Sequence, residues 1–189
     1  MKGPAYAIGN WLLYILLAFG LALWVFGAQM QPFVLTLSLS ILGIIIFKIS
    51  KNMRISSKYN PFISLAIWMN ALCYIYLPSS IGYLWYAVHF IDAFLITLIL
   101  YDYFFKNSSL KGAYSFIFLF LSVLGILALW EIYEYSIDLL APIRLQGIYS
   151  SSGRWLTYPI DDTMRDLIIG SCGSILALFV KVLNGSRKK

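Results

Sequence analysis

Long apolar runs separated by short polar segments dominate the hydrophobic pattern of this chain. Six of these runs approach or exceed the roughly 20 apolar residues that cross a bilayer as a helix. Prolines in the polar breaks, such as Pro32 and Pro61, suit the first turn of the helix that follows. We therefore predict six transmembrane helices in one membrane domain, residues 1–189. Their predicted ranges are 8–28, 32–50, 61–77, 81–105, 112–140 and 161–183.

Composition places the chain in the same class. Hydrophobic residues make up 61% of it and charged residues only 12%, against about a quarter in soluble domains. The fold class is therefore predicted as all-α, an integral multi-pass protein of the cell (inner or plasma) membrane, surrounded by membrane lipid. No nucleic-acid motif is present, so nucleic acid is not an expected partner. Cys73 and Cys172 lie within apolar runs, which indicates small core residues rather than a disulfide framework.

The distribution of basic residues predicts the orientation in the membrane. With six spans, both termini and the loops at 50–60 and 106–111 share one side of the bilayer. Most of the Lys and Arg residues fall on that side: Lys2, Lys48, Lys51, Arg54, Lys58, Lys106, Lys111, Lys181, Arg187, Lys188 and Lys189. The other side has only Arg144, Arg154 and Arg165. Because basic residues concentrate on the cytoplasmic side, both termini are predicted to be cytoplasmic.

The acidic residues, in contrast, gather at the opposite side. Of the 8 Asp and Glu residues, all but Asp92 and Asp102 lie within 131–138 and 161–166. In the predicted topology these two segments, together with His89 and Asp92, fall in the outer half of helices four, five and six. Their spacings of three, four or seven residues place the polar side chains of each helix on one face. The sequence therefore predicts an outward-facing intramembrane cluster of carboxylates and one histidine.

Three interpretations of this cluster remain open. In the first, the cluster binds a divalent metal ion and the protein is a metal-dependent enzyme acting on a lipid or isoprenoid-type substrate. In the second, neighbouring carboxylates relay protons or cations in a coupled transporter. In the third, the acids only make hydrogen bonds that specify helix packing in a non-catalytic membrane subunit. The small size of the chain favours the enzyme over a large alternating-access transporter.

The enzyme interpretation assigns a role to each polar residue. The predicted ligands or acid–base groups are Glu131, Glu134, Asp162 and Asp166, with His89 and Asp92 as further metal ligands. The longest outer segment, 141–160, carries Arg144 and Arg154, which are predicted to hold a polar headgroup. That segment is either a lid over the cluster or a simple connector.

Three segments of the chain also resemble a known family. They are Val88-His89-Phe90, the run from Ala128 to Tyr135 with its two glutamates, and the run from Asp162 to Leu167 that leads into a small-residue helix. Over residues 81–180 the sequence is similar to inner-membrane proteins of the YjdF type and, more distantly, to VanZ-like proteins, which are linked to glycopeptide resistance at the cell envelope. Arg165 stands where that family commonly has Trp. The resemblance implies a multi-helix inner-membrane protein and supplies no activity.

Overall fold

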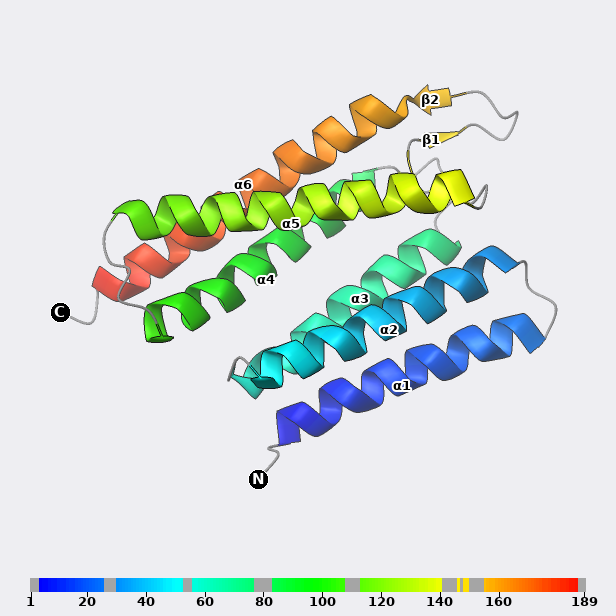
Figure 1. Ribbon diagram of the computed structural model, residues 1–189, viewed down its shortest axis with the longest axis horizontal. Helices are drawn as coiled ribbons and strands as arrows, with labels where there is room; N and C mark the ends of the chain where they lie inside the picture. Colours follow the sequence, from blue (N-terminus) through cyan, green and yellow to red (C-terminus); the bar gives the residue numbers. More distant parts are fainter. Residues whose placement is uncertain are drawn as a thin grey trace. The chain divides into compact units, whose positions relative to one another are not determined.

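The protein is helical along almost all of its described length. The computed structural model describes residues 4–25, 30–52, 56–76, 83–107, 113–140, 146, 148–149, 155–186. Within these residues the chain forms six α-helices (Figure 1). They are α1 (Pro4–Val25), α2 (Met30–Asn52), α3 (Asn60–Tyr76), α4 (Tyr83–Asn107), α5 (Ala113–Leu140) and α6 (Pro159–Ser186). The six helices correspond to the six apolar runs of the sequence.

A short hairpin interrupts the helical pattern between α5 and α6. Strands β1 (Ile148–Tyr149) and β2 (Trp155–Thr157) pair in antiparallel register, with Ile148 opposite Thr157. The prediction for residues 141–160, a lid or a simple connector, did not include this hairpin. Two and three residues are too few to show the alternation of polar and apolar positions that identifies a strand.

Three helices in the described part of the chain are long and apolar enough to cross a membrane. They cover Leu84–Phe105, Tyr114–Leu140 and Pro159–Leu183 within α4, α5 and α6. The first three helices contribute shorter apolar stretches, Ala7–Ala22, Thr36–Ile49 and Asn60–Cys73. The all-helical prediction is thus confirmed, whereas six membrane crossings remain a prediction.

The chain divides into two compact units, Met1–Leu77 and Pro78–Lys189. The first unit contains α1, α2 and α3, which run alternately up and down (Figure 1). Hydroxyl and indole groups of α3 bind the backbone of α1: Ser64 donates to the Gly9 carbonyl at 2.9 Å and Trp68 to the Leu12 carbonyl at 2.8 Å. The core of this unit is therefore tied by side-chain hydrogen bonds as well as by apolar packing.

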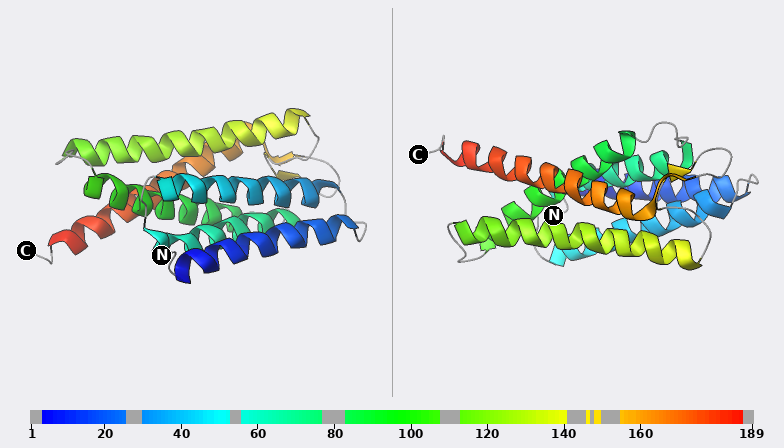
Figure 2. Two further views of the ribbon diagram at one scale, coloured as in Figure 1. Left: turned by 60° about the horizontal axis from the view of Figure 1, so that its bottom comes forward. Right: turned by 90° about the horizontal axis from the view of Figure 1, so that it is seen from above.

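In the second unit α4 and α6 run in the same direction and α5 runs in the opposite one (Figures 1 and 2). Helix α6 packs most extensively against α4. Gly173 lies against the Phe90 backbone, where a Cβ would collide with the carbonyl oxygen. Beside this contact, the hydroxyl groups of Thr97 in α4 and Ser174 in α6 form a hydrogen bond of 2.9 Å. The small residues Gly173 and Ser174 of α6 therefore allow a close approach of the two helices.

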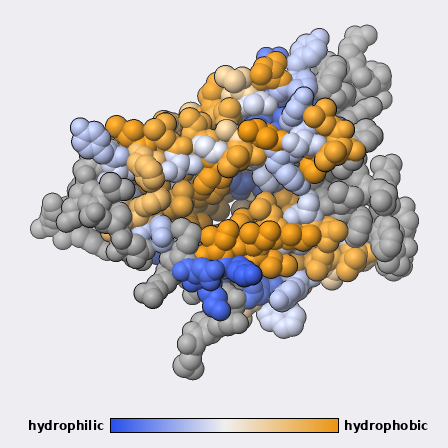
Figure 3. All heavy atoms as spheres, viewed as in Figure 1, coloured by the Kyte–Doolittle hydropathy of each residue, from blue (hydrophilic) through white to orange (hydrophobic). Residues whose placement is uncertain are grey.

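The outer faces of these helices are apolar. Leu129, Ile132, Ile168 and Phe179 are each more than half exposed, and hydrophobic side chains cover much of the described surface in view (Figure 3). An aqueous protein would bury most of these groups, whereas lipid tails solvate them. The second unit thus has the surface of a membrane-embedded bundle.

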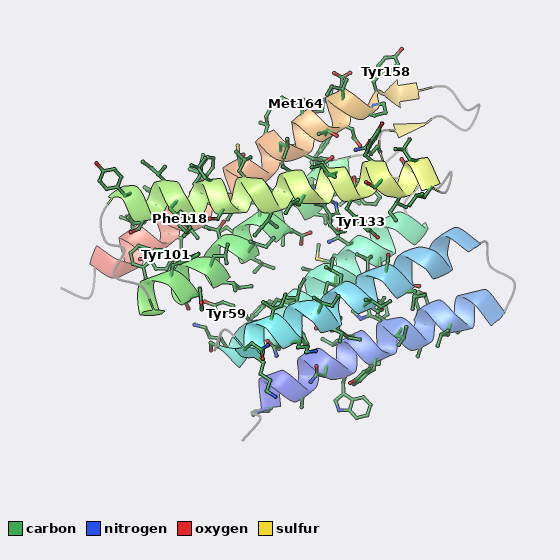
Figure 4. The ribbon with its side chains drawn as sticks, viewed as in Figure 1. Tyr59, Tyr101, Phe118, Tyr133, Tyr158 and Met164 are labelled. Atoms are coloured by element: carbon green, nitrogen blue, oxygen red, sulfur yellow. The ribbon has the colours of Figure 1, made fainter. Side chains whose placement is uncertain are left out.

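The two ends of this unit can be told apart by the side chains that lie there. Tyr101 and Phe118 mark one end, and Tyr158 and Met164 project outward near the other (Figure 4). At the Tyr101 end, Lys181 of α6 forms an ion pair with Asp102 of α4 at 2.6 Å. Asp102 therefore lies beside a neighbouring lysine. The candidate site lies toward the Tyr158 end.

Candidate metal centre

The directions of the three helices bring one polar residue from each to the same end of the second unit. His89 is about 9 Å along α4 from its start, Asp166 is about 10 Å along α6, and Glu131 lies about 13 Å before the end of α5, at 1.5 Å of rise per residue. Because α5 runs against its two neighbours, the end of α5 meets the beginnings of α4 and α6. These three side chains consequently converge at a similar depth.

The three side chains form a compact buried cluster. One ligand atom from each of His89, Glu131 and Asp166 lies within 4.8 Å of the other two. His89 Nε2 and Asp166 Oδ2 are 3.4 Å apart. His89, Glu131 and Asp166 are only 7%, 6% and 4% exposed, respectively. The cluster is therefore an internal site of the bundle rather than a surface patch.

One oxygen of the cluster has no hydrogen-bond partner among the residues that the structure describes. It is Asp166 Oδ1, which is fully buried, although buried carboxylate oxygens normally accept at least one hydrogen bond. Leaving such an oxygen without a partner costs on the order of 1–3 kcal/mol or more. A bound cation would compensate that cost.

The spacing of the three ligand atoms suits a small cation. Ligands placed about 2.0–2.1 Å from a tetrahedral ion lie about 3.3–3.4 Å from each other. The separation of 3.4 Å between His89 and Asp166 already matches this value. Glu131, the third ligand, is within reach of the same ion after small side-chain rotations.

Asp162 and Thr163, at the beginning of α6, border the cluster. Asp162 is half-buried and lies near enough to interact electrostatically with both Glu131 and Asp166. The Thr163 hydroxyl hydrogen-bonds the Glu131 carboxylate. Asp162 therefore adds negative charge at the rim of the cluster, and Thr163 contacts one of its ligands directly.

The remaining predicted acids lie outside the three-residue group. Glu134 is 2% exposed and accepts a hydrogen bond of 2.7 Å from the Trp130 indole. Asp92, one turn after His89, is half-buried. Of the six predicted ligands, the structure thus brings His89, Glu131 and Asp166 together, whereas Asp92, Glu134 and Asp162 are not members of that group.

Of the three arginines on the predicted outer side, Arg165 alone lies within the described residues. Arg144 and Arg154, predicted to hold a substrate headgroup, lie outside the described residues. Arg165 is exposed beside Asp166, and its guanidinium donates to the Tyr86 hydroxyl at 3.1 Å. That contact links the beginning of α6 to the beginning of α4.

Two polar residues near the cluster were not among the predicted site residues. Gln146 reaches from the segment after α5 to the Thr163 hydroxyl and to the Glu131 backbone carbonyl. A sequence signal was available for Thr163, because it precedes Asp166 by three residues and therefore shares its helix face. No such periodicity exists for Gln146, which lies outside any helix.

Comparison with known proteins places the chain in a family but supplies no activity. No curated protein and no solved structure matches it. The sequence does match DUF2238, described as a predicted membrane protein, over residues 9–186. The match includes most of α1, all of the other five helices and every residue of the candidate centre. The chain therefore belongs to the DUF2238 family of membrane proteins.

Proposed function

We propose that this protein is a metal-dependent membrane enzyme whose divalent ion is held by His89, Glu131 and Asp166. A single observation carries the proposal. One imidazole and two carboxylates from three helices converge in a buried site, and one of their oxygens has no hydrogen-bond partner within the described part of the chain. Buried carboxylates that are neither paired nor bound to a cation are costly in a membrane protein.

The ligand set favours a transition metal. An imidazole with two carboxylates suits Zn²⁺, Mn²⁺ or Fe²⁺, whereas Ca²⁺ prefers about six to eight oxygen ligands. Three protein ligands leave a coordination position for water or a substrate oxygen, as in catalytic zinc sites. An ion held in this way supplies an activated water or polarises a substrate bond. Glu134 and Asp162 are proposed as neighbouring acid–base groups.

The proposed substrate is an amphiphile of the lipid or isoprenoid type. Ile132 and Ile168 lie one and two residues from the ligands Glu131 and Asp166, yet both are more than half exposed. An apolar substrate tail can therefore lie against the helices that hold the ion. Arg144 and Arg154 are proposed to bind its polar headgroup.

The proposed topology has six membrane crossings with both termini in the cytoplasm. It is supported by the six helices and by the concentration of basic residues in the segments that would then be cytoplasmic. In this orientation the metal centre lies nearer the outer side of the inner or plasma membrane. The resemblance to YjdF-type proteins is consistent with that location.

A proton-coupled role is the second candidate. It is favoured by the electrostatic interactions of Asp162 with Glu131 and Asp166, since closely spaced acids can share and relay protons. This role requires no bound metal, so metal content separates it from the first.

The test is metal analysis of the purified full-length protein. Wild-type protein is expected to retain about one transition-metal ion per chain, because buried protein ligands bind such ions tightly. Asp166→Asn should lose the ion. Asp161→Asn, an exposed position one turn earlier on the same helix, is the matched control and should keep it. A wild-type protein that binds no Zn²⁺, Mn²⁺ or Fe²⁺ when these are supplied would refute the proposal.

A further inference from the structure

We infer that Thr163 and Gln146 form a positioning pair that holds the Glu131 carboxylate in place for metal binding. This inference rests on the proposed metal centre and assigns a role to two residues that lie outside its ligand set. It connects the segment between α5 and α6 to the chemistry of the site.

The hydrogen bonds around Thr163 have a defined direction. Gln146 Nε2 donates to Thr163 Oγ1 over 3.4 Å, a long contact that nevertheless occupies the hydroxyl oxygen as an acceptor. The proton of the hydroxyl is then free to point at its other partner, the Glu131 carboxylate. A deprotonated carboxylate accepts only, so Thr163 must be the donor in that bond.

Gln146 is itself held on three sides. Its backbone N–H donates to Asp138 Oδ2 at 2.9 Å, and its Nε2 also donates to the Glu131 carbonyl at 3.2 Å. Because the Glu131 carbonyl can only accept a hydrogen bond, the amide nitrogen of Gln146 rather than its amide oxygen must face that carbonyl. Gln146 is 7% exposed, so water competes little for these bonds.

Such a pair is what a metal-binding carboxylate needs from its surroundings. Ligating groups are usually oriented by hydrogen bonds from residues behind them, and loss of such a partner typically lowers metal affinity about 10- to 100-fold. Thr163 shares a helix face with Asp166, so one turn of α6 supplies both a ligand and the group that orients the opposing ligand. The Gln146 contacts extend this support to the segment outside the helices.

The experiment is a titration of full-length protein in detergent with Co²⁺, followed by the visible absorbance of the bound ion. Thr163→Val removes the hydroxyl at nearly constant volume, and Gln146→Leu removes the amide. Both should weaken Co²⁺ binding about 10- to 100-fold and alter the spectrum. Thr163→Ser retains the hydroxyl and should bind Co²⁺ like the wild type.

Thr97→Val is the matched control. Thr97 is a fully buried threonine of α4 in the same unit, bonded to Ala93 and Ser174 rather than to the cluster. It should leave Co²⁺ affinity and spectrum unchanged, even if it lowers stability. Equal losses in Thr97→Val and Thr163→Val would therefore overturn the inference.

The remaining outcomes separate this inference from the metal proposal. If the wild type binds Co²⁺ and both Thr163→Val and Gln146→Leu bind it equally well, the positioning role is wrong and the metal centre stands. If the wild type does not bind Co²⁺ at all, both are overturned. Gln146→Leu lies outside the helices, so it keeps the test valid should Thr163→Val fail to fold.

Discussion

His89 Nε2 lies 3.4 Å from Asp166 Oδ2, and both side chains are almost completely buried. The contact joins the beginning of α4 to the beginning of α6, so it is part of the packing of the unit as well as of the candidate centre. Among the residues described, none forms a hydrogen bond with the other Asp166 oxygen. A buried carboxylate in that state destabilises the metal-free protein and stabilises the metal-bound one.

Compared with the wild type, an Asp166→Asn variant should therefore be at least as stable without metal and less stable with metal. In the presence of a chelator, the variant should equal or exceed the wild type in free energy of unfolding, by up to about 2 kcal/mol, because it removes a buried charge beside other carboxylates. With excess Zn²⁺ the order should reverse, because only the wild type gains binding energy, about 2.7 kcal/mol at 100 times the dissociation constant. Thermal unfolding in detergent measures both.

Asp161→Asn provides the reference for this pair of measurements. Its carboxylate is exposed, so its unfolding should be nearly unchanged with and without Zn²⁺. A purely structural role for Asp166 gives a different pattern: Asp166→Asn would then lower stability to the same extent under both conditions.

The close approach of α6 to α4 gives a second prediction. A Cβ at Gly173 would overlap the Phe90 carbonyl, so Gly173→Ala should destabilise the protein by about 1–3 kcal/mol through forced separation of the helices. Gly125 of α5 has nothing within 4 Å of the corresponding position. Gly125→Ala should therefore be neutral or stabilising by up to about 1 kcal/mol, since alanine favours the helix. Equal effects of the two substitutions on unfolding would contradict the packing described.

The helices and the end of the unit that holds the site follow from the sequence for physical reasons. An apolar run of about 20 residues has few alternatives to a helix in lipid, because backbone groups there must bond within the segment. Alternating helix directions then bring His89, Glu131 and Asp166 to one end. The depth of the polar cluster was predictable from this alone.

The membership of the cluster was not predictable to the same degree. Residues three apart on a helix are offset by about 60° around its axis, so Glu131 and Glu134 share a face only loosely. The structure directs Glu131 toward His89 and Asp166, while Glu134 receives the Trp130 indole hydrogen. Helix rotation depends on packing, such as the contact of Gly173 with Phe90, which no periodicity in the sequence specifies.

The ion pair of Asp102 and Lys181 gives a third prediction. The two side chains are only 15–21% exposed and 2.6 Å apart, so removal of one partner leaves a poorly solvated charge. Asp102→Ala alone should lower the free energy of unfolding by about 1–3 kcal/mol, between the values for exposed and buried pairs. The double variant Asp102→Ala with Lys181→Met should recover most of that loss. Additive losses in this double-mutant cycle would show that the pair contributes no coupling.

The proposed topology gives the last prediction. In a Cys73→Ala, Cys172→Ser background, single cysteines at Gln29 and Ser151 should react with a membrane-impermeant maleimide applied to intact cells. Both positions fall between helices on the predicted outer side. Cysteines at Ser56 and Lys188 should react only after the membrane is opened, because the positive-inside rule places them in the cytoplasm.

The contrast between Gln29 and Ser56 is the decisive one, because α2 separates them and its apolar stretch, Thr36–Ile49, is shorter than those of the last three helices. A helix can cross with a short apolar stretch if flanking lysines extend to the interface and neighbouring helices cover its polar ends. Lys48 and Lys51 are exposed at the end of α2 and suit this arrangement. If Gln29 and Ser56 label alike from outside, α2 does not cross, and the metal centre must be reassigned to a side of the membrane from the label at Ser151 alone.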